Sequence, residues 1–179
     1  MTGMNRIFAW APLIGLLLGA SAFAQSSGQV SALKGHDSNA PVDVAADRIE
    51  VQDRADRAVF AGNVKARQGE LTLDTARLTL AYTSGDGIKI NRLDASRGVV
   101  VTSPSETARG NFAVYDLDRK LITLVGEVRL AREGSTINGS RLLIDLNTGR
   151  AVMDGGAPGV GHSGGRVVGH FTVPQKTRG

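Results

Sequence analysis

The 179-residue chain contains no cysteine, and only 4% of its residues are aromatic. Without cysteine, no disulfide can support the fold and no thiol is available for chemistry. Single-stranded nucleic acids bind on aromatic side chains that stack with the bases. The scarcity of aromatic residues therefore argues against a nucleic-acid partner, despite the net charge of +4. The positive excess suits either phosphorylated lipid head groups and anionic membrane surfaces or ordinary solubilising charge.

The sequence also lacks a recognisable catalytic or metal-binding centre. Its three histidines, His36, His162 and His170, lie in segments predicted to be mobile tails, where no neighbours would fix the geometry of a ligand or a base. No G-x-S-x-G nucleophile motif is present. Acidic residues at turns, such as Asp116 and Asp118, stand beside arginine or lysine and are interpreted as paired surface charge. We therefore expect a protein that is not an enzyme and that uses neither a cofactor nor a metal.

The first 24 residues have the features of a secretory signal peptide. Arg6 precedes an apolar run from Ile7 to about Ala20, and residues 22–24 form an A-x-A cleavage site. The run is shorter than the roughly 20 apolar residues that span a bilayer, so cleavage after Ala24 is favoured over an uncleaved membrane anchor. Export without disulfides is compatible with a bacterial periplasm, which is the predicted location.

The ends of the remaining chain differ in composition from its middle. Residues 25–40 and 155–179 are rich in glycine, serine and proline and show little periodicity. Such segments bury too little apolar area to offset the entropy lost on ordering them. We interpret residues 25–40 as a flexible N-terminal segment and residues 155–179 as a Gly/Pro-rich disordered tail. Residues 41–154 then form one small domain.

Within this domain, apolar residues recur at every second position. Leu71 and Leu73 show this alternation, as do Leu142, Ile144 and Leu146. Alternation places the apolar side chains on one face of a strand and the polar ones on the other. Turn signals follow about every eight to twelve residues, and no long segment keeps a helical period. The chain is therefore predicted to be all-β, with many short antiparallel strands arranged as a sandwich, jelly roll or barrel.

Two stretches of the domain resemble each other. Residues 49–80 align with residues 112–144, about 64 residues further along the chain. Each copy contains strands separated by an acidic-basic turn, a glycine and a glycine turn. A unit used twice usually cannot cover its own apolar face alone. The apolar faces either close on each other as an ordinary core or leave an interior that admits an acyl chain, and the pattern does not decide between these arrangements.

The sequence "APVDVAADRIEVQDRADRAVFAGNVKARQGELTLDTARLTLAY" (40–82) resembles the opening of the OstA-like family. That family begins with a proline and a short alternating strand that ends in an Ala/Ser-Asp pair, here residues 41–47. An F-x-G-N-V step follows at residues 60–64, and a Q-G turn at residues 68–69. The stretch "YDLDRKLITLVGEVRLAREGSTINGSRLLIDLNTGR" (115–150) resembles the C-terminal half of the family. The resemblance covers residues 41–154.

The resemblance implies a twisted antiparallel β-jelly roll, built from two similar halves, that performs no catalysis. Its sheets would form a V-shaped apolar groove that shelters the acyl chains of lipid A, so that the protein transports lipopolysaccharide. Protomers would associate head to tail, edge strand to edge strand. The resulting bridge would connect an LptC-like protein of the inner membrane with an LptD-like protein of the outer membrane.

Candidate lipid-binding residues follow from the resemblance and from the alternation of the strands. The resemblance assigns six residues to the groove: Val42, Val44, Phe60, Val101, Tyr115 and Leu117. The alternation adds five apolar residues of the same wall: Val64, Leu71, Leu73, Leu78 and Leu80. Only the resemblance implies that a lipid runs along this wall.

Three other functions are compatible with the sequence. A membrane-anchored LptC-like member of the same pathway would share the fold, although the A-x-A site argues against it. A structural β-scaffold that polymerises without carrying a lipid is an alternative from another class. A carbohydrate-active enzyme that uses surface carboxylates is a further alternative.

Overall fold

The structure, a computed structural model, describes Leu33 and residues 36–156 and 165–172. The predicted signal peptide and His162 lie outside these residues. The described elements are strands and one short 3-10 turn, which confirms the all-β prediction: β1 (Val42–Ala45), β2 (Arg48–Gln52), η1 (Asp53–Ala55), β3 (Arg57–Gln68), β4 (Leu71–Ser84), β5 (Ile88–Thr102), β6 (Glu106–Asp116), β7 (Leu121–Arg132), β8 (Ser135–Asp145), β9 (Arg150–Asp154) and β10 (Val168–His170). No helix in the described part of the chain is long and apolar enough to cross a membrane.

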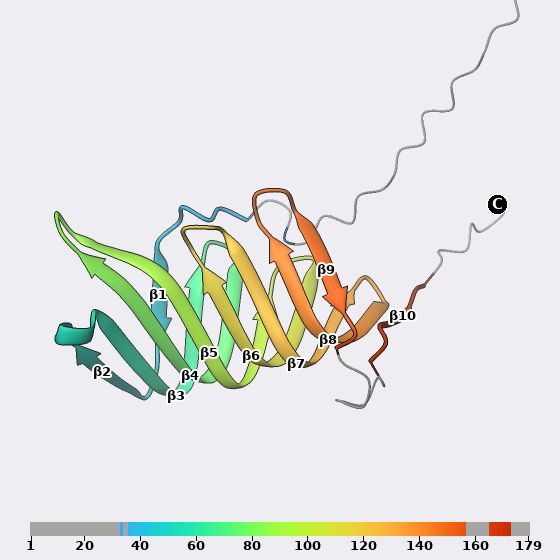
Figure 1. Ribbon diagram of the computed structural model, residues 1–179, viewed down its shortest axis with the longest axis horizontal. Helices are drawn as coiled ribbons and strands as arrows, with labels where there is room; N and C mark the ends of the chain where they lie inside the picture. The colour runs from blue at the N-terminus through green and yellow to red at the C-terminus, as the bar shows by residue number, and fades with distance from the viewer. Residues whose placement is uncertain (1–32, 34–35, 157–164, 173–179) are drawn as a thin grey trace, which may run out of the picture.

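All of these strands belong to one antiparallel sheet (Figure 1). The strands β3 to β8 pair in the order in which they occur along the chain, each with the next. At one side of the sheet, both β1 and β2 pair with β3, and at the other side both β9 and β10 pair with β8. A single strand can have two partners on the same side because each long strand is divided into two parts.

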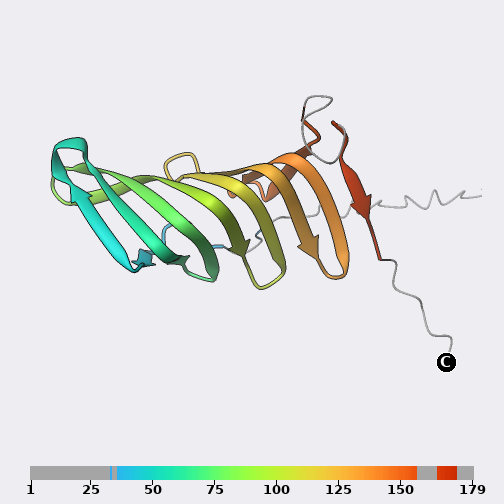
Figure 2. The ribbon, with the colours of Figure 1, turned by 90° about the horizontal axis from the view of Figure 1, so that it is seen from below.

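The division is visible in the register. Pairing is interrupted near the middle of every strand from β3 to β8, and the long strands bend there, along the lower side of the molecule in Figure 1 (Figures 1 and 2). We call the two resulting halves of the sheet the first and the second arm. The first arm contains β1, β10 and residues 64–68, 71–75, 99–102, 106–110, 128–132 and 135–139. The second arm contains β2, β9 and residues 57–61, 77–84, 88–96, 112–116, 121–125 and 141–145.

The bends require a backbone conformation that favours glycine. A pair of residues with positive φ interrupts β3 at 62–63, β5 at 97–98 and β7 at 126–127. Each pair contains one glycine, the residue that adopts this conformation without steric cost, and extra residues in one strand of a pair sharpen the bend. At Gly62 the space is also tight, because an added Cβ would collide with the carboxylate of Asp47. Around Gly98 no atom lies within 4 Å of such a Cβ.

The recurrence of the bend refines the predicted repeat. Three hairpins, β3–β4, β5–β6 and β7–β8, carry the same interruption. The two similar stretches that the sequence shows are therefore centred on the first and the third hairpin. The middle hairpin has the same backbone plan, but its bend reads Arg97–Gly98 instead of beginning with glycine.

The core lies between the two arms. Side chains of both arms join in one cluster of buried apolar residues. In the second arm the register aligns one inward-facing row across seven strands: Phe60, Leu78, Ala95, Ala113, Leu124, Leu142 and Met153. In the first arm a facing row crosses seven strands as well: Val44, Ala66, Leu73, Val101, Ala108, Leu130 and Ile137. Such rows run perpendicular to the strands, so the apolar interior extends along the whole sheet.

One end of this interior is uncovered. Ile49 and Val51 on β2 pair with Phe60 and Ala58, and they continue the inward-facing rows of the second arm. They are nevertheless more than half exposed, because β2 is an edge strand with no neighbour beyond it. The exposure therefore reflects the place of β2 at the edge of the sheet.

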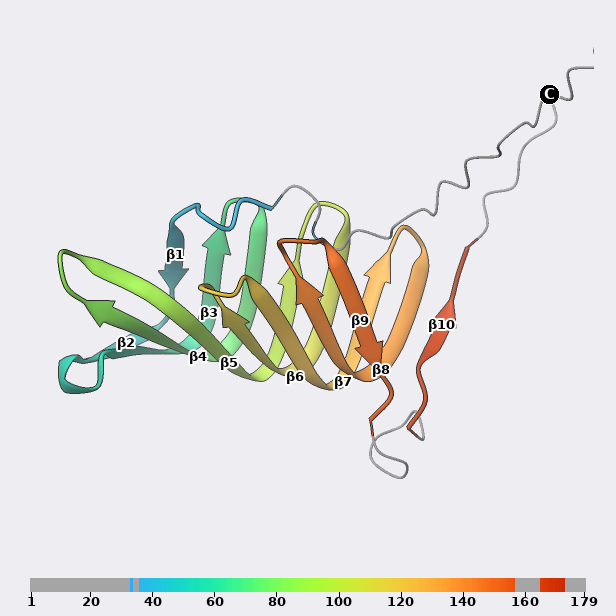
Figure 3. The same cartoon turned by 45° about the horizontal axis from the view of Figure 1, so that its top comes forward.

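Parts of both predicted tails have a position in the fold. The side chain of Leu33 is buried in the core cluster, and residues 36–40 lead from it to β1 along the side opposite the bends (Figure 3). In the C-terminal segment, the exposed strand β10 pairs with residues 136–138 of β8. The sequences of these two segments show no alternation of apolar and polar residues. A single buried side chain and a short pairing at the edge of the sheet do not require one. The remainder of the predicted tails lies outside the described residues.

Candidate functional site

The apolar interior between the arms is the candidate site, and all eleven predicted residues lie in it. Six come from the first arm (Val42, Val44, Val64, Leu71, Leu73 and Val101) and four from the second (Phe60, Leu78, Leu80 and Tyr115), while Leu117 lies in the turn that follows β6. Eight are buried in the core cluster, and Val42, Val44 and Leu117 pack against it while partly exposed. The structure thus brings together residues that are up to 75 positions apart. Contact of these residues with a lipid stays a prediction.

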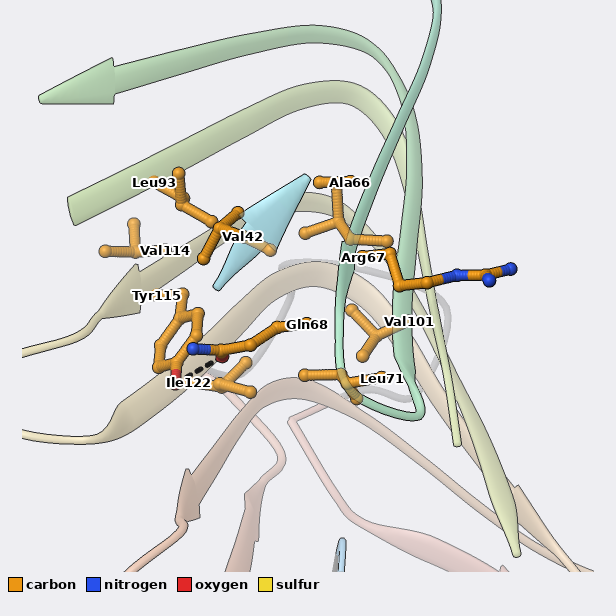
Figure 4. Close-up of a pocket in the computed structure, with 12 residues that line it drawn as sticks. Val42, Ala66, Arg67, Gln68, Leu71, Leu93, Val101, Val114, Tyr115 and Ile122 are labelled. Atoms are coloured by element: carbon orange, nitrogen blue, oxygen red, sulfur yellow. Dashed lines mark hydrogen bonds between the residues drawn. The ribbon is translucent and has the colours of Figure 1, made fainter. Parts of the chain in front are cut away.

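The space left between the arms near Gln68 and Tyr115 is small. The cavity between the arms has a volume of about 30 Å³ and is lined by Val42, Ala66, Arg67, Gln68, Leu71, Leu73, Leu93, Val101, Ala113, Val114, Tyr115 and Ile122 (Figure 4). Pockets that hold small molecules usually measure about 300–1,000 Å³. Around this cavity the facing side chains fill most of the space between the arms, and a ligand can enter there only if the arms separate or side chains move.

A larger cleft lies beside the closed cavity. It has a volume of about 590 Å³ and is bordered by residues 38–42, by the turn ends of β4–β5 and β6–β7, and by Gln68. Val42 and Gln68 line both the cleft and the closed cavity. The apolar side chains of Ile90 and Leu117 continue from the cleft into the core cluster. The cleft and the cavity between the arms therefore share part of their lining.

Gln68 belongs to this shared lining, and sequence reasoning assigned it only to a turn. Its side chain is buried, and its Oε1 accepts a hydrogen bond from the Tyr115 hydroxyl across the two arms at 3.0 Å (Figure 4). Its Nε2 donates to the backbone carbonyls of Ser38 at 3.1 Å and Ala40 at 2.9 Å. The ring Nε2 of His36 lies 3.1 Å from the same Oε1. The signal for Gln68 was its alternation with Val64 and Ala66, which places it inward.

Burial changes the ionisation of the polar groups at this position. It raises the pKa of Tyr115 to about 12, although the bond to Gln68 acts in the opposite direction. The phenol therefore stays protonated at neutral pH and remains a hydrogen-bond donor. Burial also lowers the pKa of His36, against the opposing effects of Gln68 and Asp37. A neutral imidazole at this place avoids burying a positive charge.

Glu106, at the start of β6, is a second buried polar residue that the sequence analysis did not select. Its Oε1 accepts a hydrogen bond of 2.6 Å from the backbone N–H of Leu33. Burial raises the pKa of Glu106, while the Leu33 N–H and the charge of Arg132 lower it. Arg132 is the direct cross-strand partner of Glu106 on β7. Gln68 and Glu106 thus both bind the segment that precedes β1.

The charged residues around the cleft form exposed ion pairs, as predicted. Lys89 lies 2.6 Å from Asp118, and Arg119 lies 3.7 Å from Asp116. Hydrogen bonds from Lys89 and Asn91 lower the pKa of Asp118. Exposed pairs contribute little to stability, about 0–1 kcal/mol. Among the described residues no group of three histidines or carboxylates is placed to hold a metal ion.

The chain is similar in sequence to known proteins. Residues 43–150 match the family model described as LptA/(LptD N-terminal domain) LPS transport protein. An uncharacterized protein of Rhizobium meliloti (strain 1021) is 30% identical over 160 residues, which cover 83% of this chain and 86% of that protein. The lipopolysaccharide export system protein LptH of Pseudomonas aeruginosa is 26% identical over 125 residues, covering 64% of this chain and 71% of LptH.

The LPS-assembly protein LptD of Aeromonas hydrophila is 32% identical over 124 residues, which cover 68% of this chain but only 14% of LptD. The crystal structure of Pseudomonas aeruginosa LptH, described as the LptA homologous periplasmic component of the conserved lipopolysaccharide transport device, superimposes with a TM-score of 0.65 at 20% identity. It covers 77% of this chain and 99% of that chain, and confirms the predicted twisted β-jelly roll. Because the match over residues 43–150 includes more than half of the chain, the protein belongs to the LptA/(LptD N-terminal domain) family of lipopolysaccharide transport proteins.

Proposed function

We propose that this protein binds lipopolysaccharide in the periplasm and shelters its lipid A acyl chains between the two arms. The observation that carries the proposal is the pair of facing apolar rows, which cross seven strands each. Neighbouring strands lie about 4.8 Å apart, so each row is about 30 Å long. A row of this length offers an elongated apolar surface, which fits a hydrocarbon chain better than a compact metabolite. Membership of a transport family and the periplasmic relative LptH support the same function.

The physical reason for such a site is the insolubility of acyl chains. Each methylene group kept out of water contributes roughly 0.8 kcal/mol, so a lipid with several chains cannot cross an aqueous compartment unaided. Inside the protein, the chains would replace contacts that the arms now make with each other. The small cavity of about 30 Å³ indicates that binding must separate the arms or move side chains around the chain.

The uncovered end of the interior supports the proposed assembly. Ile49 and Val51 leave apolar surface exposed on the edge strand β2. An edge strand with free backbone groups pairs readily with another chain. We infer that a second copy extends the rows head to tail there, and that an LptC-like protein and an LptD-like protein occupy the two ends of the resulting bridge.

A photo-crosslinking experiment tests the proposal with a matched pair of residues. Phe60 is buried and faces the interior, whereas Phe112 is 56% exposed, on the outer side of the same arm. A photoreactive phenylalanine at position 60 should form an adduct with lipopolysaccharide in cells, and the same group at position 112 should not. Adducts of position 60 with protein alone would refute lipid transport and favour a scaffold that carries no lipid.

A further inference from the structure

The segment in front of β1 closes the mouth of the interior. Leu33 inserts its side chain into the core cluster, where it is 6% exposed. Residues 36–40 then follow the side of the molecule opposite the bends (Figure 3). The segment contacts the first arm through Gln68 and Glu106. It reaches the turn between β6 and β7 through Asn39, whose Oδ1 accepts a hydrogen bond of 3.5 Å from Lys120.

The described contacts between this segment and the sheet are polar, apart from those of the Leu33 side chain. Ser38 and Ala40 are held by one side-chain amide, that of Gln68, and Leu33 by one apolar side chain and one N–H. Residues 36–40 contain no strand and alternate between half-buried and exposed positions. Segments with few buried contacts open at a lower free energy than paired strands. The segment can therefore leave its place while the sheet remains intact.

The segment also stands where an incoming ligand would have to pass. The cleft of about 590 Å³ is bordered by residues 38–41 on one side, and Gln68 lines both this cleft and the cavity between the arms. The hydrogen bonds of Gln68 to Ser38, Ala40 and Tyr115 fix this side chain between the arms. Loss of the segment would remove two of these partners and vacate the space filled by Leu33. The cleft and the interior would then form one continuous space.

We propose that Leu33 and residues 36–40 act as a lid over the interior, and that Gln68 is the latch that holds it. An acylated lipid enters through the cleft and displaces the lid, because its chain needs the space that Leu33 occupies. Lid docking and lipid binding therefore exclude each other. This inference rests on the proposed lipid binding and adds the place of entry and the segment that controls it.

Spin labels can report the position of the lid, since the chain has no native cysteine. Asp37→Cys labels the lid, and Ile88→Cys labels the far side of the cleft; both positions are exposed. The free protein should give one short, narrow distance distribution between the labels. Lipopolysaccharide at one molar equivalent should make it longer and broader. The deacylated form of the same lipopolysaccharide, which lacks the chains, should leave it unchanged.

The latch is tested by Gln68→Leu, with Gln52→Leu as the matched control. Leucine keeps most of the volume of Gln68 but makes none of its hydrogen bonds, so the lid should be displaced even without lipid. Lipopolysaccharide should also associate about tenfold faster. Gln52 lies on β2 and bonds to Glu50 and Arg57, away from the lid, so its replacement should change neither quantity.

Co-elution of lipopolysaccharide with the protein separates the two proposals. If lipid co-elutes while the labels keep their short distance, the lid is wrong and lipid binding stands. If no lipid co-elutes, the proposed function is wrong. In that case, the lipid-free distances of Gln68→Leu still decide whether Gln68 holds the segment.

Discussion

Replacing Tyr115 by phenylalanine deletes one oxygen atom from the interior and tests whether the arms are joined by a polar contact. The Tyr115 hydroxyl donates to Gln68 Oε1 at 3.0 Å, and the two residues belong to different arms. The chain has one other tyrosine, Tyr82. The Tyr82 hydroxyl lies on the surface and donates to Asp53 at 3.4 Å. Tyr82→Phe is therefore a control with identical chemistry.

The expected loss of stability depends on the hydrogen bond that each hydroxyl makes and on the partners that remain after its removal. An intramolecular hydrogen bond contributes about 0.5–1.5 kcal/mol net, and after Tyr115→Phe the Oε1 of Gln68 still has His36 at 3.1 Å. We therefore expect a loss of about 1 kcal/mol in the free energy of unfolding. For a domain of about 120 residues this lowers the melting temperature by about 4 °C. Tyr82→Phe should change the free energy by about 0.5 kcal/mol or less.

Urea unfolding followed by far-UV circular dichroism measures both variants, and a double-mutant cycle with Gln68→Leu isolates the contact. If the bond exists, the losses from Tyr115→Phe and Gln68→Leu should not add, and the coupling energy should be about 1 kcal/mol. Equal losses for the two tyrosine variants, or additive losses in the cycle, would refute the reasoning. The polar link between the arms would then contribute nothing to closure.

Alkaline titration of the same two tyrosines gives an independent readout. Burial raises the pKa of Tyr115 to about 12, above the value of about 10 expected in the unfolded chain. The native protein should thus lose stability as the pH rises through this window, because only the unfolded state ionises readily. The phenolate absorbance of the folded protein should show a step near pH 12 that is missing in Tyr115→Phe. A single step near pH 10 for both tyrosines would contradict the burial.

Three further predictions concern the core, the bends and the mouth of the interior. Leu124→Ala should lower the free energy of unfolding by about 3–5 kcal/mol, because this side chain is fully buried. Val125 faces outward, and Val125→Ala should lower it by about 1 kcal/mol or less. Equal urea midpoints for the two variants would contradict the inward position of Leu124 and the outward position of Val125. Gly98→Ala should lower the free energy of unfolding by about 1–2 kcal/mol, because of the positive φ at this position alone. Gly62→Ala should lower it further, because the added Cβ collides with the carboxylate of Asp47. The same melting temperature for both variants would argue against that collision. Burial raises the pKa of Glu106, so the folded state binds its proton more tightly and the native protein gains stability as the pH falls from 7 through the raised pKa. Glu106→Gln should therefore be more stable than the original protein at pH 7, and this difference in stability should disappear near pH 4. A difference that does not depend on pH would contradict the burial of a charge.

The sequence revealed the walls of the interior because alternation is a local property. Leu71 and Leu73 share a face in any strand, whatever its partners, so their inward position needed no tertiary information. Val101 was placed by resemblance, and its register with Leu73 and Ala108 shows that it faces inward. The fold and the inward positions that the alternation assigned were therefore predictable, whereas the other six positions came from the resemblance.

The mouth of the interior was not predictable in the same way. Gln68 sits at an inward position, but a polar residue beside a glycine is equally typical of a turn. Leu33 is one apolar residue in a segment without periodicity, and its burial depends on contacts with Glu106, 73 positions away. Contacts of this kind are set by the assembled sheet. The residues that control access were missed for the same physical reason that they can move: no local pattern fixes them.

The apolar interior and the polar contacts of the lid contribute differently to the free energy needed to admit an acyl chain. An acyl chain that separates the arms exchanges apolar contacts for apolar contacts, so the interior itself opposes entry only weakly. The hydrogen bonds of Gln68 and Glu106 to the lid are different, because a hydrocarbon chain cannot replace them. At about 1 kcal/mol each, their loss amounts to a few kcal/mol. Burying a chain of about twelve carbons contributes roughly 9 kcal/mol. Acyl chains can therefore open this mouth, whereas a hydrophilic ligand has no comparable free energy with which to displace the lid.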